Sequence, residues 1–589
     1  MADGDATRPY DPAADTAGSV TTGASDAHPT LVDRYVPGVE SLRTYQRKWF
    51  RSDLVAGIVL AAILVPQGMA YAELAGLPPV NGLYTTIACL VGYALMGPSK
   101  ILVLGPDSSL GPLIFAAVVP LVVAGDDPAK AVTLAAMLAI IVGLIEIGLG
   151  VGKLGFVADL LSSEVQIGYM NGLAITIVVG QLPKLSGFST DADTFVEEVR
   201  EFLTNFDQRD ATALTVGLVT LGVLLLLPRI TKKIPAVLVA VVGATAATAV
   251  FDFDIGTVGS LPEGLPTPEM PWTDLGDVVP LLIAAIGITL VSLTDTIALS
   301  TSFNARRGEQ VRPNQEMIGI GAANIAAGVF QGFAISSSSS RTAVAEQSGA
   351  KSQLTGLVGA GMVVLLLLFF NGLLADLPNS ALAAVVIAAA FSLADFAVLA
   401  RVWQVRRSAV MLSVVASLGV MLLGVLEGIL VAVVLSILLF FQRNWWPHGE
   451  VLGRVPGRTG WHSAREGTGL VERPDVVVFR WEAPLFFANS GMFADQVREL
   501  AAERRPTWVV LQCEAITDID VTAAGMLERL DNELNAKGVH LAFVEMRTRL
   551  RDLVHDYGLF QTLDRDHFYG SIEEALADLD RAPVNEDPL

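Results

Sequence analysis

The sequence predicts an all-α polytopic membrane domain followed by a small α/β domain, and three observations indicate this fold class. The 589 residues have a mean hydropathy of +0.54, and only 17% of them are charged, against roughly a quarter in soluble proteins. Apolar runs long enough to cross a bilayer follow one another from about residue 53 to 443. Beyond Trp446 the chain becomes polar, and short strand patterns alternate with helical ones.

Composition excludes several classes of function. The net charge of −21 argues against a nucleic-acid partner, because phosphate binding needs a basic surface. The two cysteines, Cys89 and Cys513, lie in different parts of the chain and give no disulfide framework. All six histidines lie outside the apolar region. Ion or proton chemistry within the membrane must therefore use carboxylates and hydroxyls.

The first elements place the N-terminus inside the cell. Residues 1–42 predict a disordered cytoplasmic tail, because they lack the basic and apolar regions of a secretory signal. Residues 43–51 then carry four cations and an aromatic pair. Such a cluster before an apolar run is typical of an anchor on the cytoplasmic face.

The membrane domain, residues 43–443, is expected to contain fourteen transmembrane segments. Cations collect after the sixth, eighth and twelfth, on the side of the N-terminus, whereas loops 184–210 and 252–277 are dominated by acids and should be extracellular. Fourteen spans with both ends inside divide into seven plus seven, and the second half is then inverted relative to the first. The segments are 53–73, 80–97, 101–123, 131–150, 156–181, 211–227, 235–250, 278–302, 314–330, 333–350, 353–374, 379–398, 409–424 and 426–442, and the cations are Arg229, Lys232, Lys233, Arg306, Arg307, Arg312, Arg401, Arg406 and Arg407.

The C-terminal part is expected to be a linker, residues 444–472, an α/β domain, 473–582, and a tail, 583–589. Strand patterns alternate with helical ones, which predicts a small sheet covered on one face. The expected strands are 475–481, 507–514 and 539–546, and the expected helices are 521–537, 547–557 and 572–579.

Two apolar segments, the third and the tenth, are interrupted at equivalent places in the two halves. The third breaks at Gly105-Pro106-Asp107, with an acid or serine expected to cap the following helix, and the tenth breaks at the serine run 336–340 before Arg341. Non-helical backbone at membrane depth is tolerated only where it is buried in protein or lines a cavity. Helix N-termini attract anions, and Arg341 would add a full charge. The alternative is that Arg341 pairs with a structural carboxylate and the serines form a surface loop.

Two further segments carry candidate site residues. Gln67 and Tyr71 share one helix face and could line the same cavity, or they could pack against a neighbouring helix and the interface. Asp295 lies among hydroxyls in an otherwise uncharged run, where a carboxylate is costly unless it is protonated or binds a cation. That is what coupling to H⁺ or Na⁺ requires, although a structural pair with Arg341 is the alternative. Glu146 and Glu427 are expected to be structural or lipid-interface residues.

At these positions the sequence resembles the SulP family of sulfate permeases and related anion transporters, which includes prestin and pendrin. The C-terminal domain is similar to the STAS domains that follow such transporters, with residues 516–523 at the characteristic turn. Seven motifs follow the family's order and cover most of the membrane region: Asp53–Gly57, Pro66–Ala72, Leu77–Pro79 with Gly82–Tyr84, Gly97–Ser99, Asn314–Glu316, Asn324 and Ser340–Thr342.

The resemblance implies a uracil-permease-like fold, with core and gate domains that move as an elevator, commonly in dimers. It also implies site roles. Many relatives carry Glu where Asp295 stands, and animal members have an aromatic residue where Asp107 stands, so the role of Asp107 is open. The family's anion-site positions are matched by Gln67, Tyr71, Ser338, Ser340 and Arg341, its cation-coupling position by Asp295, and a threonine of its sodium site by Ser339. In the STAS domain, Thr522 matches a serine that is phosphorylated in related anti-sigma-factor antagonists. The alternative is that Thr522 is an unmodified threonine at a helix N-terminus.

The predicted function is secondary active transport of an inorganic anion, coupled to H⁺ or Na⁺. The resemblance to the family favours sulfate as the anion. Neither an enzymatic activity nor a cofactor other than a coupling Na⁺ is expected. The partners would be a small anion, the bilayer and a second copy of the chain, in a cell membrane with both termini cytoplasmic. The alternatives are a bicarbonate:Na⁺ symporter, an uncoupled anion exchanger or channel, a nucleobase permease, and a membrane-anchored signalling protein.

Overall fold

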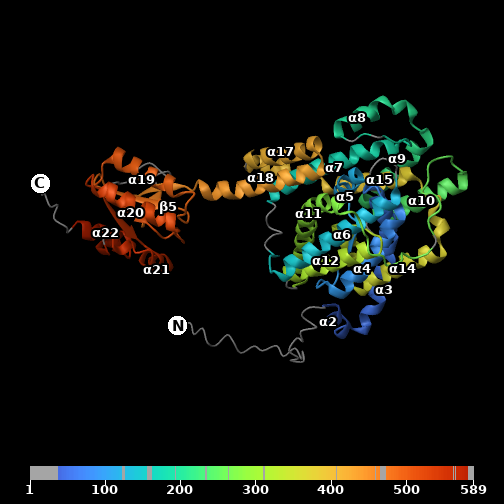
Figure 1. Cartoon of the computed structure of the whole chain (residues 1–589), viewed down its shortest axis with the longest axis horizontal. Coiled ribbons are helices and arrows are strands. Elements are labelled where there is room, and N and C mark those ends of the chain that lie inside the picture. Colours follow the sequence, from blue (N-terminus) through green and yellow to red (C-terminus); the bar gives the residue numbers. More distant parts are fainter. Residues whose placement is uncertain are drawn as a thin grey trace, which may run out of the picture. The chain divides into compact units, whose positions relative to one another are not determined.

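The computed structural model divides the chain into two compact units, residues 1–433 and 434–589 (Figure 1). Outside its described residues lie most of the expected N-terminal tail, the start of the fifth segment, Lys232, Lys233, Arg406, residues 464–472 of the expected linker, and the C-terminal tail. The structure describes residues 37–122, 127–155, 162–190, 192, 194–231, 235–262, 264–308, 312–405, 407–457, 459–463, 473–561, 563 and 565–580.

The first unit is built from helices, and each of the fourteen expected segments contains one. Among the described residues, seven helices are long and apolar enough to cross a membrane, and five apolar helices are shorter, so the count of fourteen spans stays a prediction. The fourteen are α3 Phe50–Leu74, α4 Pro79–Met96, α5 Gly111–Val118, α6 Pro128–Val151, α7 Ser163–Leu185, α9 Ala211–Ile230, α10 Ala236–Phe251, α11 Leu275–Arg307, α12 Pro313–Val329, α13 Ser339–Gln347, α14 Leu354–Phe369, α15 Asn379–Leu393, α17 Arg407–Leu423 and α18 Val425–Trp445. Two further helices, α8 Phe195–Thr204 and α16 Phe396–Val405, lie between these segments.

One helix differs from the expected disorder of residues 1–42. Helix α2, Pro37–Arg43, packs against α4. Gly38 makes this contact possible, because a Cβ there would lie 2.6 Å from the carbonyl oxygen of Leu95.

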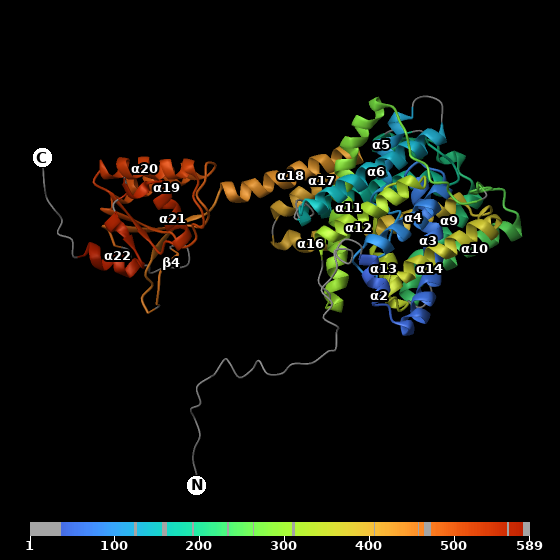
Figure 2. The same cartoon turned by 60° about the horizontal axis from the view of Figure 1, so that its bottom comes forward.

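Helix α12 packs closely against its neighbours in the first unit. Helix α12 contacts α4 and α6, and α11 also packs on α6, as Figure 2 shows. A Cβ at Gly143 of α6 would lie 2.5 Å from the carbonyl oxygen of Gly321 on α12. The absence of side chains at both positions therefore lets the two backbones approach, as small residues do between membrane helices.

The two predicted breaks meet. Strand β1, Leu104–Gly105, pairs antiparallel with β2, Ser336–Ser337, so that Leu104 lies opposite Ser337. Helices α5 and α13 begin just after these strands. The expected side-chain caps are not seen, because α5 has Leu110 as its N-cap and Ser338 makes no capping bond at the start of α13.

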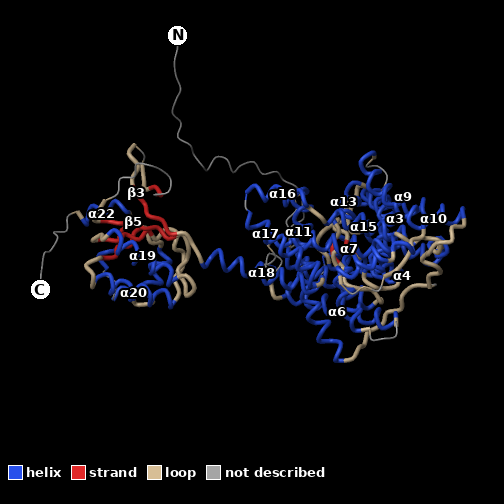
Figure 3. Tube along the Cα trace, turned by 90° about the horizontal axis from the view of Figure 1, so that it is seen from above, coloured by secondary structure: helices blue, strands red, loops and turns tan. Residues whose placement is uncertain are grey.

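The C-terminal unit is a six-stranded sheet with helices on both faces, shown in red and blue in Figure 3. The strand order is β4-β3-β5-β6-β7-β8, and β5 to β8 are parallel. The strands are β3 Gly449–Gly453, β4 His462–Ser463, β5 Val476–Trp481, β6 Trp508–Gln512, β7 His540–Val544 and β8 Phe568–Tyr569, and the helices are α19 Ser490–Arg504, α20 Val521–Asn535, α21 Thr548–Asp556 and α22 Ile572–Leu579.

Three features of this unit differ from the sequence-based expectation. Part of the expected linker forms β3, which pairs antiparallel with β5. Helix α19 was not expected, although Phe493, Val497 and Ala501 repeat at helical spacing on its buried side. The sheet is also covered on both faces, because its strands alternate inward-facing side chains between two apolar clusters, one of which includes Ile572 and Ala575 of α22.

Candidate functional site

A cavity of about 560 Å³ lies beside the two broken helices. Its walls come from α3, α11, the break before α5 and the start of α13, so segments far apart in the sequence meet there. Six of the seven predicted anion-site and cation-site residues line it: Gln67, Tyr71, Asp295, Ser338, Ser339 and Ser340. Asp107, Ser108 and Ser337, which were not assigned site roles from the sequence, line it too.

The seventh predicted residue, Arg341, lies behind the wall. Its side chain is fully buried and is not among the residues that line the cavity. The Nη1 group donates a hydrogen bond to the carbonyl oxygen of Pro106, and Nη2 lies 3.8 Å from Oδ2 of Asp107. The pairing with Asp107 differs from the alternative expectation, which placed Arg341 against Asp295. Arg341 therefore joins the start of α13 to the break before α5.

Gly105 makes room for this guanidinium. A Cβ at Gly105 would lie 3.2 Å from Nη1 and 3.3 Å from Cζ of Arg341. Within the described part of the chain, Nε and Nη2 of Arg341 have no hydrogen-bond partner. The charge is thus held in place by one backbone oxygen and one carboxylate, and two of its nitrogens keep unused donors.

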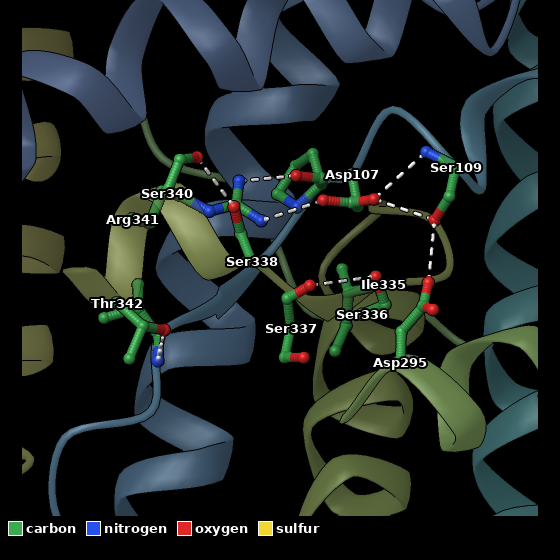
Figure 4. Close-up of polar contacts among 12 residues, drawn as sticks. Asp107, Ser109, Asp295, Ile335, Ser336, Ser337, Ser338, Ser340, Arg341 and Thr342 are labelled. Carbon is green, nitrogen blue, oxygen red and sulfur yellow. Dashed lines mark hydrogen bonds and ion pairs between the residues drawn. The ribbon is translucent and has the colours of Figure 1, made fainter. Parts of the chain in front are cut away.

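Asp295 is linked to Asp107 through one serine, as Figure 4 shows. Oγ of Ser109 lies 2.8 Å from Oδ1 of Asp107 and 3.3 Å from Oδ2 of Asp295. The backbone N of Ser109 also donates to Oδ1 of Asp107, at 3.0 Å, and Nε2 of Gln166 donates to Oδ1 of Asp295, at 3.3 Å. Sequence reasoning missed Ser109 and Gln166. The acid-serine-serine pattern of the break was the available signal for Ser109.

In the described part of the chain, several polar atoms around the cavity have no hydrogen-bond partner. Oε1 of Gln67 and Oγ of Ser337 are buried and have no hydrogen-bond partner among the described residues. Both residues line the cavity. The hydroxyls of Ser338 and Ser340 lie 3.1 Å apart. Because buried polar groups are normally hydrogen-bonded, these atoms indicate a site for a polar ligand.

Glu146 of α6 fixes the strand that leads into the serine run. It is fully buried, so it is structural and does not face lipid. Its carboxylate accepts from Oγ of Ser292, at 2.9 Å, and from Nδ2 of Asn324, at 2.8 Å. Oδ1 of Asn324 accepts from the N–H of Ile335, and Oγ of Ser292 lies 3.2 Å from the carbonyl oxygen of the same residue. These contacts close a ring that holds both backbone groups of Ile335.

Thr522 is exposed in the first turn of α20, and its proposed modification stays a prediction. The N-cap of this helix is Asp520, whose carboxylate accepts from the N–H of Ala523 at 2.8 Å. The capping acceptor is therefore supplied by Asp520.

Fold and site together define a class: a multi-pass helical membrane protein with two broken helices beside a polar cavity, the arrangement of secondary transporters, plus an α/β domain. The chain belongs to the sulfate permease family, whose model matches residues 50–416. A STAS domain model matches residues 469–575. These matches confirm the family and the C-terminal domain expected from the motifs.

Relatives in sequence agree with this assignment. A probable sulfate transporter of Mycobacterium tuberculosis is 40% identical over 554 residues, which are 93% of this chain and 99% of the relative. The human solute carrier family 26 member 6 is 31% identical and covers 80% of this chain and 65% of its own length.

Two structures support the fold alone, since their identities are low. Murine solute carrier 26 family member A9, in an inward-facing state, has a TM-score of 0.86 at 23% identity and covers 95% of this chain and 96% of its own. The transmembrane domain of the cyanobacterial bicarbonate transporter BicA has a TM-score of 0.59 at 22% identity, over 67% of this chain and 98% of its own.

Proposed function

We propose that this protein is a secondary active transporter of inorganic anions and that sulfate is its substrate. The observation that carries the proposal is the cavity in which the serine run meets the residues of α3 and α11, in a chain of the sulfate permease family. The relatives named as sulfate transporters favour sulfate over other anions.

The cavity has the chemistry to bind an oxyanion. The first turn of α13 offers backbone N–H groups without acceptors inside the helix, together with the positive end of its dipole. Ser338, Ser339, Ser340 and Gln67 all line this cavity and bring three hydroxyls and an amide to its wall. Arg341 adds a positive potential from behind the wall, because charge acts over distance in a medium of low dielectric constant.

Asp295 supplies the coupling site in this proposal. It lines the same cavity as the serines, with Ser339 as the second residue of a possible Na⁺ site. A cation bound at Asp295, whether H⁺ or Na⁺, would stabilise a nearby anion electrostatically. That mutual stabilisation is a coupling free energy between two neighbouring sites.

The remaining features follow from the family and the charge pattern. We propose that a core domain containing the broken helices moves against a gate domain as an elevator, in a homodimer. The protein would lie in the cell membrane with both termini cytoplasmic, because the predicted topology collects the cation-rich loops on the side of the N-terminus, as is typical of cytoplasmic loops.

Uptake into proteoliposomes tests the function. Purified protein should take up radioactive sulfate faster when a proton or sodium gradient points inward than when none is imposed. The panel should include bicarbonate, chloride, a dicarboxylate and uracil. Na⁺-driven uptake of bicarbonate without sulfate uptake would instead support a bicarbonate:Na⁺ symporter. Equal fluxes with and without a gradient would support an uncoupled exchanger or channel. Competition by uracil would support a nucleobase permease.

A further inference from the structure

Asp107 stands between the cavity and Arg341. Asp107 lines the cavity and its side chain is 12% exposed, whereas the side chain of Arg341 is fully buried and reaches only Asp107 and Pro106 through its polar contacts in the described structure. Figure 4 shows the carboxylate between the guanidinium and Ser109. An anion in the cavity can therefore contact the carboxylate of Asp107, whereas the guanidinium of Arg341 acts on the anion only from behind the cavity wall.

Ser109 and Arg341 contact the carboxylate of Asp107 from two sides. The N–H and Oγ of Ser109 both contact Oδ1, at 3.0 and 2.8 Å, and Nη2 of Arg341 lies 3.8 Å from Oδ2. These hydrogen bonds and the cation favour the ionised carboxylate, whereas the burial of the side chain opposes the charge. Ser109 thus holds Oδ1 of Asp107 through two hydrogen bonds, and Oδ2 faces the guanidinium of Arg341.

The charges around the cavity do not favour an anion by themselves. Arg341 contributes one positive charge, Asp107 cancels it when ionised, and Asp295 adds a second carboxylate on the cavity wall. The helix dipole and the serine hydroxyls must then attract the anion against Asp107. Nε and Nη2 of Arg341, Oε1 of Gln67 and Oγ of Ser337 have no hydrogen-bond partner among the residues that the structure describes, so the polar groups of this region are incompletely satisfied there.

We propose that Asp107 is an intramolecular competitor of the transported anion, which neutralises Arg341 and sets the preference of the site between divalent and monovalent anions. This inference rests on the proposed anion site and adds a residue whose role the sequence left open. The repulsion between the carboxylate and an anion grows in proportion to the charge of the anion. Asp107 therefore penalises sulfate about twice as much, in free energy, as it penalises chloride.

Removing the charge of Asp107 tests this prediction. Calorimetric titration at one fixed pH should show that Asp107→Asn binds both anions more tightly than the wild type. Because the free energy doubles with the charge, the gain for sulfate should be about the square of the gain for chloride, for example about tenfold against about threefold. Asp107→Glu is the matched control, since it keeps the charge, and it should not reproduce the larger gain for sulfate than for chloride.

A second neutral variant guards against misfolding. Asp107→Ser removes the charge and keeps a hydroxyl, and it should show the same ranking as Asp107→Asn. Equal gains for the two anions, or no gain in either neutral variant that folds, would overturn the role of Asp107 while leaving sulfate transport intact. A wild-type protein that binds neither anion would instead refute the proposed function, and this inference with it.

Discussion

Arg341→Ala is expected to damage both the stability of the membrane unit and its affinity for anions. The distance of 3.8 Å between Nη2 and Oδ2 of Asp107 corresponds to about 4 kcal/mol of attraction at an effective dielectric constant of about 20. Both side chains are largely buried, so little is lost to solvent screening. Removing one partner of a buried pair typically costs about 3–5 kcal/mol, because the other charge stays uncompensated. The carbonyl of Pro106 also loses its donor.

The same substitution removes the positive potential and leaves Asp107 facing the anion. Sulfate affinity should fall at least about tenfold, which corresponds to about 1.4 kcal/mol. The assay is calorimetric titration with sulfate, together with the melting temperature of the purified protein. The double variant Arg341→Ala/Asp107→Asn is the control, and it should recover a large part of both losses, because it leaves no unpaired charge. If the single variant bound sulfate with unchanged affinity, the cation would be structural and the proposed anion site would be misplaced.

Three further predictions concern Asp295, Glu146 and Cys513. Asp295→Asn should remain folded and lose gradient-driven uptake, since an amide neither releases a proton nor supplies charge for Na⁺; accumulation of sulfate against its gradient by this variant would exclude the coupling role. Glu146→Gln should keep the melting temperature, because the amide oxygen can accept from Nδ2 of Asn324 while the amide nitrogen donates to Oγ of Ser292, whose hydroxyl can then donate to the carbonyl oxygen of Ile335. Glu146→Leu should lower the stability by about 1–3 kcal/mol, because it leaves buried polar groups unpaired. Equal melting temperatures for the two variants would contradict this. Burial raises the pKa of the Cys513 thiol, so a maleimide reagent at neutral pH should label it only after denaturation, and mass spectrometry showing rapid labelling of the native protein would contradict the buried position.

The sequence determined where the apolar helices of the membrane unit lie and which two apolar segments are interrupted. Long apolar runs have few stable alternatives in a membrane, because every backbone group must be hydrogen-bonded within its own segment. Gly105-Pro106 and the serine run interrupt that pattern locally. Their positions could therefore be predicted, as could the family to which the chain belongs.

The C-terminal unit shows where local patterns were insufficient. Strand β3 is short and polar at its start, and it becomes part of the sheet only because β5 supplies an antiparallel edge. The sequence also did not predict that helices cover both faces of the sheet. The strands are apolar on both sides, and the local pattern does not indicate which helix packs on which face.

The partners of the charged residues were decided by the tertiary structure. From the sequence, Arg341 could have paired with Asp295 or with another carboxylate, because the break before α5 and the start of α13 are more than two hundred residues apart. The antiparallel pairing of β1 with β2 brings Gly105 against Arg341 and thereby places Asp107 beside the guanidinium. The role of Ser109 also depends on the tertiary structure, because its hydrogen bond to Asp295 forms only when α5 and α11 pack together. Residue types set which charges the cavity holds, and the pairing of two short strands set which of them compensate each other.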